Sequence, residues 1–164
     1  MAQVAASSRV GILDTSWLLE LYRVPGHFDD SRAQQIYSKT DELITRNCEL
    51  LVTVPVLFEV SQHITHVKSG HRRRTLSKKF RDNIASSVAE DTPWTIPTID
   101  KGTLLRAEDI IKLADRFVAS YGQNYSFADI SIIDLTEQFR QKDRVVTILT
   151  FDKQLLAYSE DATR

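Results

Sequence analysis

The stretch VGILDTS, residues 10–16, decides the fold. Its apolar half is short and ends abruptly in three polar residues, which is the pattern of a buried strand with polar side chains at its carboxyl end. A second run, residues 145–149, is rich in β-branched side chains and leads into TFD at residues 150–152. Both predicted strands therefore end next to an aspartate, Asp14 in one case and Asp152 in the other.

Helical patterns fill the segments between these strands. Apolar spacing and cap residues predict helices at 17–22, 56–67, 72–89, about 100–121, 126–141 and 153–158. A further, longer helix is expected after the cap residue Asp29 or Ser31, with Ile36, Leu43 and Ile44 at helical spacing. Further strands are expected at residues 50–54 and, as an edge strand because it holds Pro93 and Pro97, at 93–99. Strands that alternate with helices predict a three-layer α/β/α fold with a central, mostly parallel sheet.

Two of these helices have a clear apolar stripe. In the segment 72–89 the apolar positions recur every four residues, at Leu76, Phe80, Ile84 and Val88. The helix expected after the cap residue Asp100 has its stripe at Leu104, Ala107, Ile111, Ala114, Val118 and Tyr121. We expect each stripe to face the core.

Composition sets the broad class. The chain has 164 residues, of which 42% are hydrophobic, enough for one domain spanning residues 1–164 and too few for two ordinary ones. The net charge of -1 indicates neither nucleic acid nor membrane. Cys48 is the only cysteine, which excludes an internal disulfide and a multi-cysteine zinc site and predicts a small buried residue. With no leader-like start and no membrane-length apolar run, we expect a soluble, cytoplasmic protein.

Four acidic residues are expected at one edge of the sheet. Asp14 and Asp152 follow the two clear strands, Glu59 lies early in the helix after the second strand, and Asp129 begins the helix before the last strand. In an open parallel sheet these positions converge beyond the carboxyl ends of the strands. Four carboxylates would repel one another unless a hard cation lay between them, and an all-oxygen set suits Mg²⁺ or Mn²⁺. Such a site supports phosphodiester hydrolysis by activated water, with no side-chain nucleophile.

Four short motifs carry a resemblance to a known family. ILDTS (12–16), VPVLFE (54–59), SFAD (126–129) and LTFD (149–152) resemble the four acidic motifs of PIN-domain ribonucleases, in the family's order. The resemblance implies a magnesium-dependent nuclease that cuts single-stranded RNA, and this class of mechanism implies a 5'-phosphate product. It also implies supporting roles for Thr15, Ser16 and Thr150, with Asp134 as a second-rank candidate.

The resemblance extends to VapC-type toxins, which implies a small antitoxin partner and a homodimer. The segment from residue 63 to residue 92 is longer than in the compact toxins, so the choice between toxin and processing nuclease stays open.

Three of the four acids also have a plainer interpretation. Asp129 could close a capping box with Ser126, Asp152 could cap the last helix, and Glu59 could be a solvated glutamate. Asp14 is harder to explain in this way, because a carboxylate directly after a buried strand needs a partner to offset its desolvation.

A basic helical segment at about 68–90 is the second candidate site. Seven of the 21 Lys and Arg residues lie between residues 68 and 81, and no acidic residue interrupts them. They are Lys68, Arg72, Arg73, Arg74, Lys78, Lys79 and Arg81. A solvated helix face is the simple alternative, but such clustering in a chain of nearly neutral charge favours contact with an RNA backbone. His63, His66 and His71 fit surface or phosphate contacts better than a zinc site.

Two rival functions follow from the same residues. A non-catalytic module of the same fold would bind RNA or protein without cutting. A phosphatase would use Asp14 as a covalent nucleophile, although no second aspartate stands two positions further on to act as acid and base.

Overall fold

The computed structural model describes residues 9–89, 94–97 and 107–161. Its sheet forms around β1 (Arg9–Leu13), four of whose five residues are buried. β1 pairs in parallel with β2 (Glu49–Leu51) on one side and with β4 (Val145–Leu149) on the other. β3 (Trp94–Thr95) extends the sheet beyond β2, giving the order β3-β2-β1-β4 with every pairing parallel. The predicted parallel sheet and the edge position of the third strand are confirmed.

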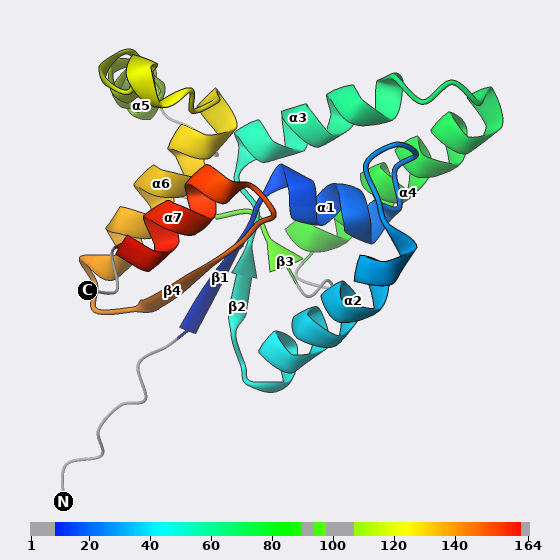
Figure 1. Cartoon of the computed structure of the whole chain (residues 1–164), viewed down its shortest axis with the longest axis horizontal. Coiled ribbons are helices and arrows are strands. Elements are labelled where there is room, and N and C mark those ends of the chain that lie inside the picture. Colours follow the sequence, from blue (N-terminus) through cyan, green and yellow to red (C-terminus); the bar gives the residue numbers. More distant parts are fainter. Residues whose placement is uncertain (1–8, 90–93, 98–106, 162–164) are drawn as a thin grey trace, which may run out of the picture.

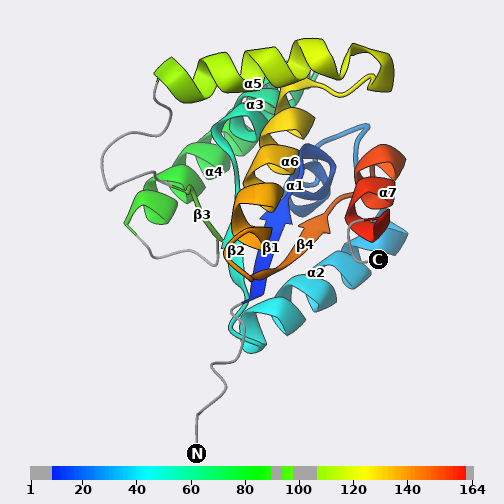
Figure 2. The same ribbon diagram turned by 90° about the vertical axis from the view of Figure 1, so that its left-hand side faces the viewer.

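Helices cover both faces of this sheet, as Figures 1 and 2 show. α1 (Thr15–Tyr22), α2 (Asp30–Thr45) and α7 (Lys153–Asp161) lie on one side, and α4 (Gly70–Val88) and α6 (Phe127–Arg140) on the other. α3 (Val54–Thr65) runs outward from the carboxyl edge of the sheet beside α1, α4 and α6, and α5 (Ala107–Ala119) packs against α6. The three-layer α/β/α prediction is therefore confirmed.

Local sequence explains where the helices begin. The Asp29 side chain accepts from the Ser31 backbone at the start of α2, and Ser69 does the same for Arg72 at the start of α4. Pro55 lies in the first turn of α3, where its missing N–H leaves no bond unmade. The short link between strand and helix places the first turn of α3 at the carboxyl edge of the sheet, where function gathers in this class of fold.

Burial corrects part of the predicted helix faces. Leu76 is buried and Phe80 and Ile84 pack partly against the core, but Val88 is 74% exposed. On α2, Leu43 is buried as predicted while Ile44 is exposed. Both exceptions directly follow a buried residue, Ser87 in α4 and Leu43 in α2. Adjacent positions of a helix point about 100° apart, so one faces solvent where its neighbour faces the core.

The predicted stripe of α5 is wrong in the described part of the helix. Ala107, Ile111, Ala114 and Val118 are all exposed, with Val118 at 70%, and the buried residue is Leu113. The cause is the neighbour: α5 packs against α6, and contacts from Arg116 and Phe117 to that helix set its inward face. Cys48 is buried, as expected.

Some expectations lie outside the described residues. They concern the start of the chain at residues 1–8, Pro93 of the edge strand, the cap Asp100, the stripe residue Leu104 and the end of the basic segment at residue 90. Within the residues that the structure does describe, no helix is both long enough and apolar enough to cross a membrane.

Candidate active site

The pairing of β1 with β4 brings the first and last acidic motifs together. Leu13 is in register with Leu149, and the backbone N–H of Asp14 donates to the Leu149 carbonyl at 3.0 Å. Asp14 therefore follows one strand directly beside Thr150, which follows the other. This arrangement places both motifs at the carboxyl edge of the sheet.

The Asp14 carboxylate is buried and is held through one of its oxygens. Only 4% of the residue is exposed. Its Oδ2 accepts from the Ser16 hydroxyl at 2.6 Å, from the Thr150 hydroxyl at 2.7 Å and from the Ser16 backbone N–H at 3.3 Å. Hydrogen bonds to a charged acceptor are the stronger kind, so they offset the cost of burying the charge.

The same two hydroxyls connect Asp14 to the loop that carries Asp152. The Ser16 hydroxyl accepts from the Phe151 N–H at 2.9 Å, and the Thr150 hydroxyl accepts from the Asp152 N–H at 2.8 Å. Each hydroxyl thus donates to Asp14 and accepts from the last motif. The Oδ1 atom of Asp152 accepts from backbone N–H groups in the first turn of α7, at 2.7 and 3.1 Å, so its capping role is present as well.

Asp129 comes to this group from the first turn of α6. Its Oδ2 accepts from the Ser126 N–H at 2.7 Å, and its own N–H donates to the Ser126 hydroxyl at 3.1 Å, which is the capping box expected from the sequence. The pKa of Asp129 is raised above its ordinary value, chiefly by burial; the bonds from Ser126 oppose the rise, and the charges of Asp14 and Asp152 add to it. Asp129 therefore interacts electrostatically with the other two aspartates.

Glu59 reaches the group through the residue next to Asp14. Its Oε2 accepts from the Thr15 hydroxyl at 2.5 Å. A 2.7 Å hydrogen bond between the hydroxyls of Thr53 and Ser131 fixes the start of α3 against α6. Glu59 therefore flanks the aspartates by way of Thr15.

Each of the four acids has one carboxylate oxygen engaged by a donor. The engaged atoms are Asp14 Oδ2, Glu59 Oε2, Asp129 Oδ2 and Asp152 Oδ1. Among the described residues, no hydrogen bond reaches the second oxygen of any of them, and no Lys or Arg forms an ion pair with them. Capping by Asp129 and Asp152 thus leaves an oxygen available on each.

The chemistry of these carboxylates suits a hard divalent cation, but the present distances between them do not yet form a ligand set. They repel one another, they lack a positive partner in the described part of the chain, and their available atoms are all oxygens. No three Asp, Glu, His or Cys side chains among the described residues are already arranged as ligands of one ion. A cation would have to draw the acids together, and water would complete its shell.

Asp134 lies on the same helix but is engaged elsewhere. Its Oδ1 accepts from Arg116 of α5 at 2.9 Å, and its Oδ2 accepts from Gln138 at 2.6 Å. Both oxygens are occupied, unlike those of the other acids. We therefore leave Asp134 out of the proposed ligand set.

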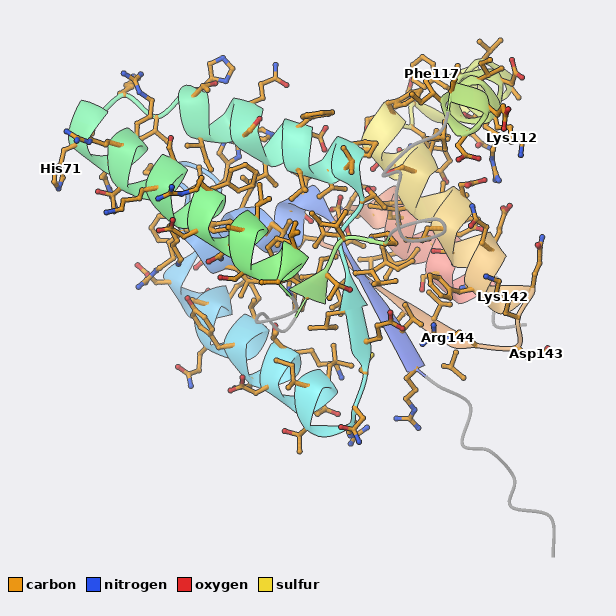
Figure 3. All side chains as sticks on the ribbon, turned by 180° about the vertical axis from the view of Figure 1, so that it is seen from behind. His71, Lys112, Phe117, Lys142, Asp143 and Arg144 are labelled. Carbon is orange, nitrogen blue, oxygen red and sulfur yellow. The ribbon has the colours of Figure 1, made fainter. Side chains whose placement is uncertain are left out.

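The basic residues lie on α4, except for Lys68, which lies in the link between α3 and α4. Figure 3 shows His71 at the outer end of α4, away from the sheet. Arg81 pairs with Asp82 at 2.7 Å, and the Lys79 ammonium lies 5.4 Å from the centre of the Tyr22 ring. The other basic residues of the cluster are exposed and have no ion pair with a described residue; they are Lys68, Arg72, Arg73, Arg74 and Lys78.

Two features beside the acids had not been expected from the sequence. Tyr125 precedes the third motif, and its pKa is raised by burial and then by the charges of Asp129 and Asp152, so it lies near the group. The Phe151 ring stacks on Trp17 at 5.2 Å, with Arg32 on it at 5.0 Å. This stack fixes the loop between the last two polar residues of the site.

No known protein family matches this sequence, and no curated protein matches it.

Proposed function

We propose that the chain is a PIN-like endoribonuclease that hydrolyses single-stranded RNA with Mg²⁺ or Mn²⁺. One observation supports the proposal most directly. Asp14 is held by two hydroxyls that also bind the Asp152 loop, and the pKa of Asp129 is raised by burial and by the charges of Asp14 and Asp152. The arrangement concentrates negative charge at the edge of the sheet where α/β proteins bind ligands. The order of the four motifs along the chain supports the same proposal.

The residues that would hold the cation are those with an available oxygen. The first candidates are Asp129 and the two aspartates whose charges act on it, Asp14 and Asp152; Glu59 joins as a ligand or as a base. When bound, the cation would make a water molecule easier to deprotonate and would neutralise charge that builds on the phosphate. Hard oxygen ligands select Mg²⁺ or Mn²⁺ over softer ions.

The surrounding residues have positioning roles. Ser16 and Thr150 hold Oδ2 of Asp14, which leaves Oδ1 for the ligand, and Thr15 holds Oε2 of Glu59 in the same way. The remaining oxygen of Glu59 can accept a proton from the attacking water. A carboxylate held on one side loses less freedom when its other oxygen binds.

The exposed cations of α4 give the substrate a path toward this edge. Glu59 stands six residues before the end of α3, a distance of about 9 Å at 1.5 Å per residue. A hollow on α4, the helix that runs back from that end beside α3, is lined in part by Arg74, Lys78 and Lys79. Cations of this kind bind phosphates without reading sequence, so we propose that they hold the RNA backbone while the acids cut it.

The cellular role follows from the resemblance alone. We propose a cytoplasmic toxin of a toxin–antitoxin pair, with a small antitoxin protein and a homodimer as its assemblies. A small gene that overlaps or adjoins this one and encodes such a partner would support the toxin role. A lone gene would favour a processing nuclease.

RNA cleavage with matched variants tests the proposal. Purified protein should cut single-stranded RNA in Mg²⁺ or Mn²⁺ and stop in excess EDTA. Asp14→Asn keeps the size of the side chain but removes a ligand charge, so we expect a rate loss of about 100-fold or more. Asp41→Asn is the control, since Asp41 is an exposed α2 residue outside the site, and it should cut normally.

The outcomes separate the proposal from its rivals. Equal cleavage in EDTA, or full activity of Asp14→Asn, would rule out this metal mechanism. RNA binding without cleavage would indicate the non-catalytic module, and a trapped phosphate ester on Asp14 would indicate the phosphatase.

A further inference from the structure

Two histidines from distant parts of the chain meet beside α3. His27 lies in the loop between α1 and α2, and His63 lies in the last turn of α3. The Nε2 atom of His27 and the Nδ1 atom of His63 are 3.2 Å apart, a hydrogen bond in which the tautomers decide the donor, and the two ring centres are 4.4 Å apart at an angle of 69°. The pair involves neither His66 nor His71, the other histidines near it in the sequence.

Both partners are held in place by their backbones. His63 belongs to a regular helix, while the His27 N–H donates to the Val24 carbonyl at 3.0 Å. Two residues later, the Asp29 N–H donates to Glu20, whose side chain is almost fully buried and pairs with Arg32. The loop therefore presents the His27 ring to α3 from a turn fixed on either side.

The separation of the two nitrogens suits two ligands of one metal ion. Zinc–nitrogen bonds of about 2.0–2.1 Å at a tetrahedral angle place two ligand nitrogens about 3.3–3.4 Å apart, close to the observed 3.2 Å. Both rings are at least partly exposed, so they can turn from facing each other to facing a shared ion. Neutral imidazole binds such ions, and the pKa of His63 is lowered, chiefly by burial and then by His27, which favours the neutral form.

We propose that His27 and His63 form a two-histidine site for a borderline transition-metal ion such as Zn²⁺, which fastens the α1–α2 loop to α3. Water would complete the coordination, because among the described residues no three ligand side chains form a ready group. Glu59 lies one helical turn before His63, and its negative charge acts on that ring. That charge favours a cation at the site. The nitrogen ligands distinguish this site from the oxygen set proposed for Mg²⁺.

Zinc titration of the full chain tests the proposal. Calorimetry is run with Zn²⁺ alone as ligand, in millimolar Mg²⁺ so that the carboxylate oxygens are occupied. His27→Gln and His63→Gln should each bind at least about tenfold more weakly than the wild type, because loss of an outer-shell partner alone costs 10–100-fold. His71→Gln, on the exposed end of α4, is the matched control and should bind like the wild type. Zn²⁺ should raise the thermal midpoint of the wild type and of the control, and much less that of the two variants.

Unchanged Zn²⁺ affinity in His27→Gln would overturn the proposal, as would loss of binding in His63→Gln alone. His27 is exposed, so His27→Gln decides the matter even if the helix variant fails to fold. The site does not depend on the proposed nuclease. Asp14→Asn should keep Zn²⁺ binding, and loss of binding there would assign the metal to the acidic group.

Discussion

Thr150→Val removes one of the two hydroxyls that connect Asp14 to the last motif. The Thr150 hydroxyl is buried, donates to Asp14 at 2.7 Å and accepts from the Asp152 N–H at 2.8 Å. Valine has nearly the same shape, so the change removes both hydrogen bonds without opening a cavity. Any effect therefore reports on the polar contacts and not on packing.

The size of the effect follows from the two bonds. A hydrogen bond to a charged group contributes about 1.5–3 kcal/mol, and an N–H left without its acceptor costs up to about 1 kcal/mol where it is only partly buried. Asp14 keeps its bonds from Ser16, which limits the loss. We expect about 2–3 kcal/mol of destabilisation, or a fall of roughly 1–2 M in the urea midpoint at an ordinary m-value.

The assay is urea unfolding in EDTA, followed by RNA cleavage in Mn²⁺. Thr150→Ser keeps the hydroxyl and should retain most of the stability and activity, while Thr147→Val on the exposed side of β4 should unfold within about 0.5 kcal/mol of the wild type. If Thr150→Val matched Thr147→Val in stability and cut RNA at the wild-type rate, the network would have no role in holding Asp14.

Two further predictions concern Asp129 and the basic helix. An acid whose pKa is raised on folding destabilises the folded state above that pKa, and this destabilisation fades as the pH falls through it. The pKa of Asp129 is raised, so urea titrations in EDTA should show Asp129→Asn to be more stable than the wild type at pH 7. The difference in stability should be smaller near pH 4. Mn²⁺ should raise the melting midpoint of the wild type more than that of Asp129→Asn; at a hundred times Kd the wild type gains the equivalent of about 2.7 kcal/mol. If the variant melted well below the wild type without metal and responded equally to Mn²⁺, Asp129 would be a helix cap only. Replacing Arg72, Arg73 and Arg74 by Ala should weaken RNA binding and flatten its dependence on salt, measured by fluorescence anisotropy. Lys39→Ala, on exposed α2, is the control; an unchanged salt slope in the triple variant would show that α4 is only a solvated face.

Much of the fold could be predicted because local signals agree with the tertiary structure. The abrupt change from apolar to polar at Asp14 marks a strand end, Pro55 marks a helix start, and Ser126 with Asp129 marks a cap, each of which depends on neighbours in the sequence. The ends of parallel strands meet at one edge whatever the details of packing. That rule alone placed Asp14 beside the last motif.

The remaining features depend on contacts that no local pattern encodes. Helical spacing permits two stripes on α5, and only its packing against α6 selects the face with Leu113. The bond from Thr15 to Glu59 joins residues 44 positions apart, and the pair of His27 with His63 spans 36. Asp134 had the right chemistry for a ligand, but the approach of Arg116 from another helix engages it.

The most direct measurement is the position of Mn²⁺ in crystals of this protein, located by its anomalous scattering. We predict a peak within about 2–2.5 Å of the available oxygens of Asp14 and Asp129, a hard-cation distance, with Asp152 or Glu59 close enough to bind directly or through water. The peak should vanish in Asp14→Asn and persist in Asp41→Asn. Crystals saturated with Mn²⁺ that show no peak at these carboxylates, or one that survives Asp14→Asn unchanged, would contradict the proposed metal centre.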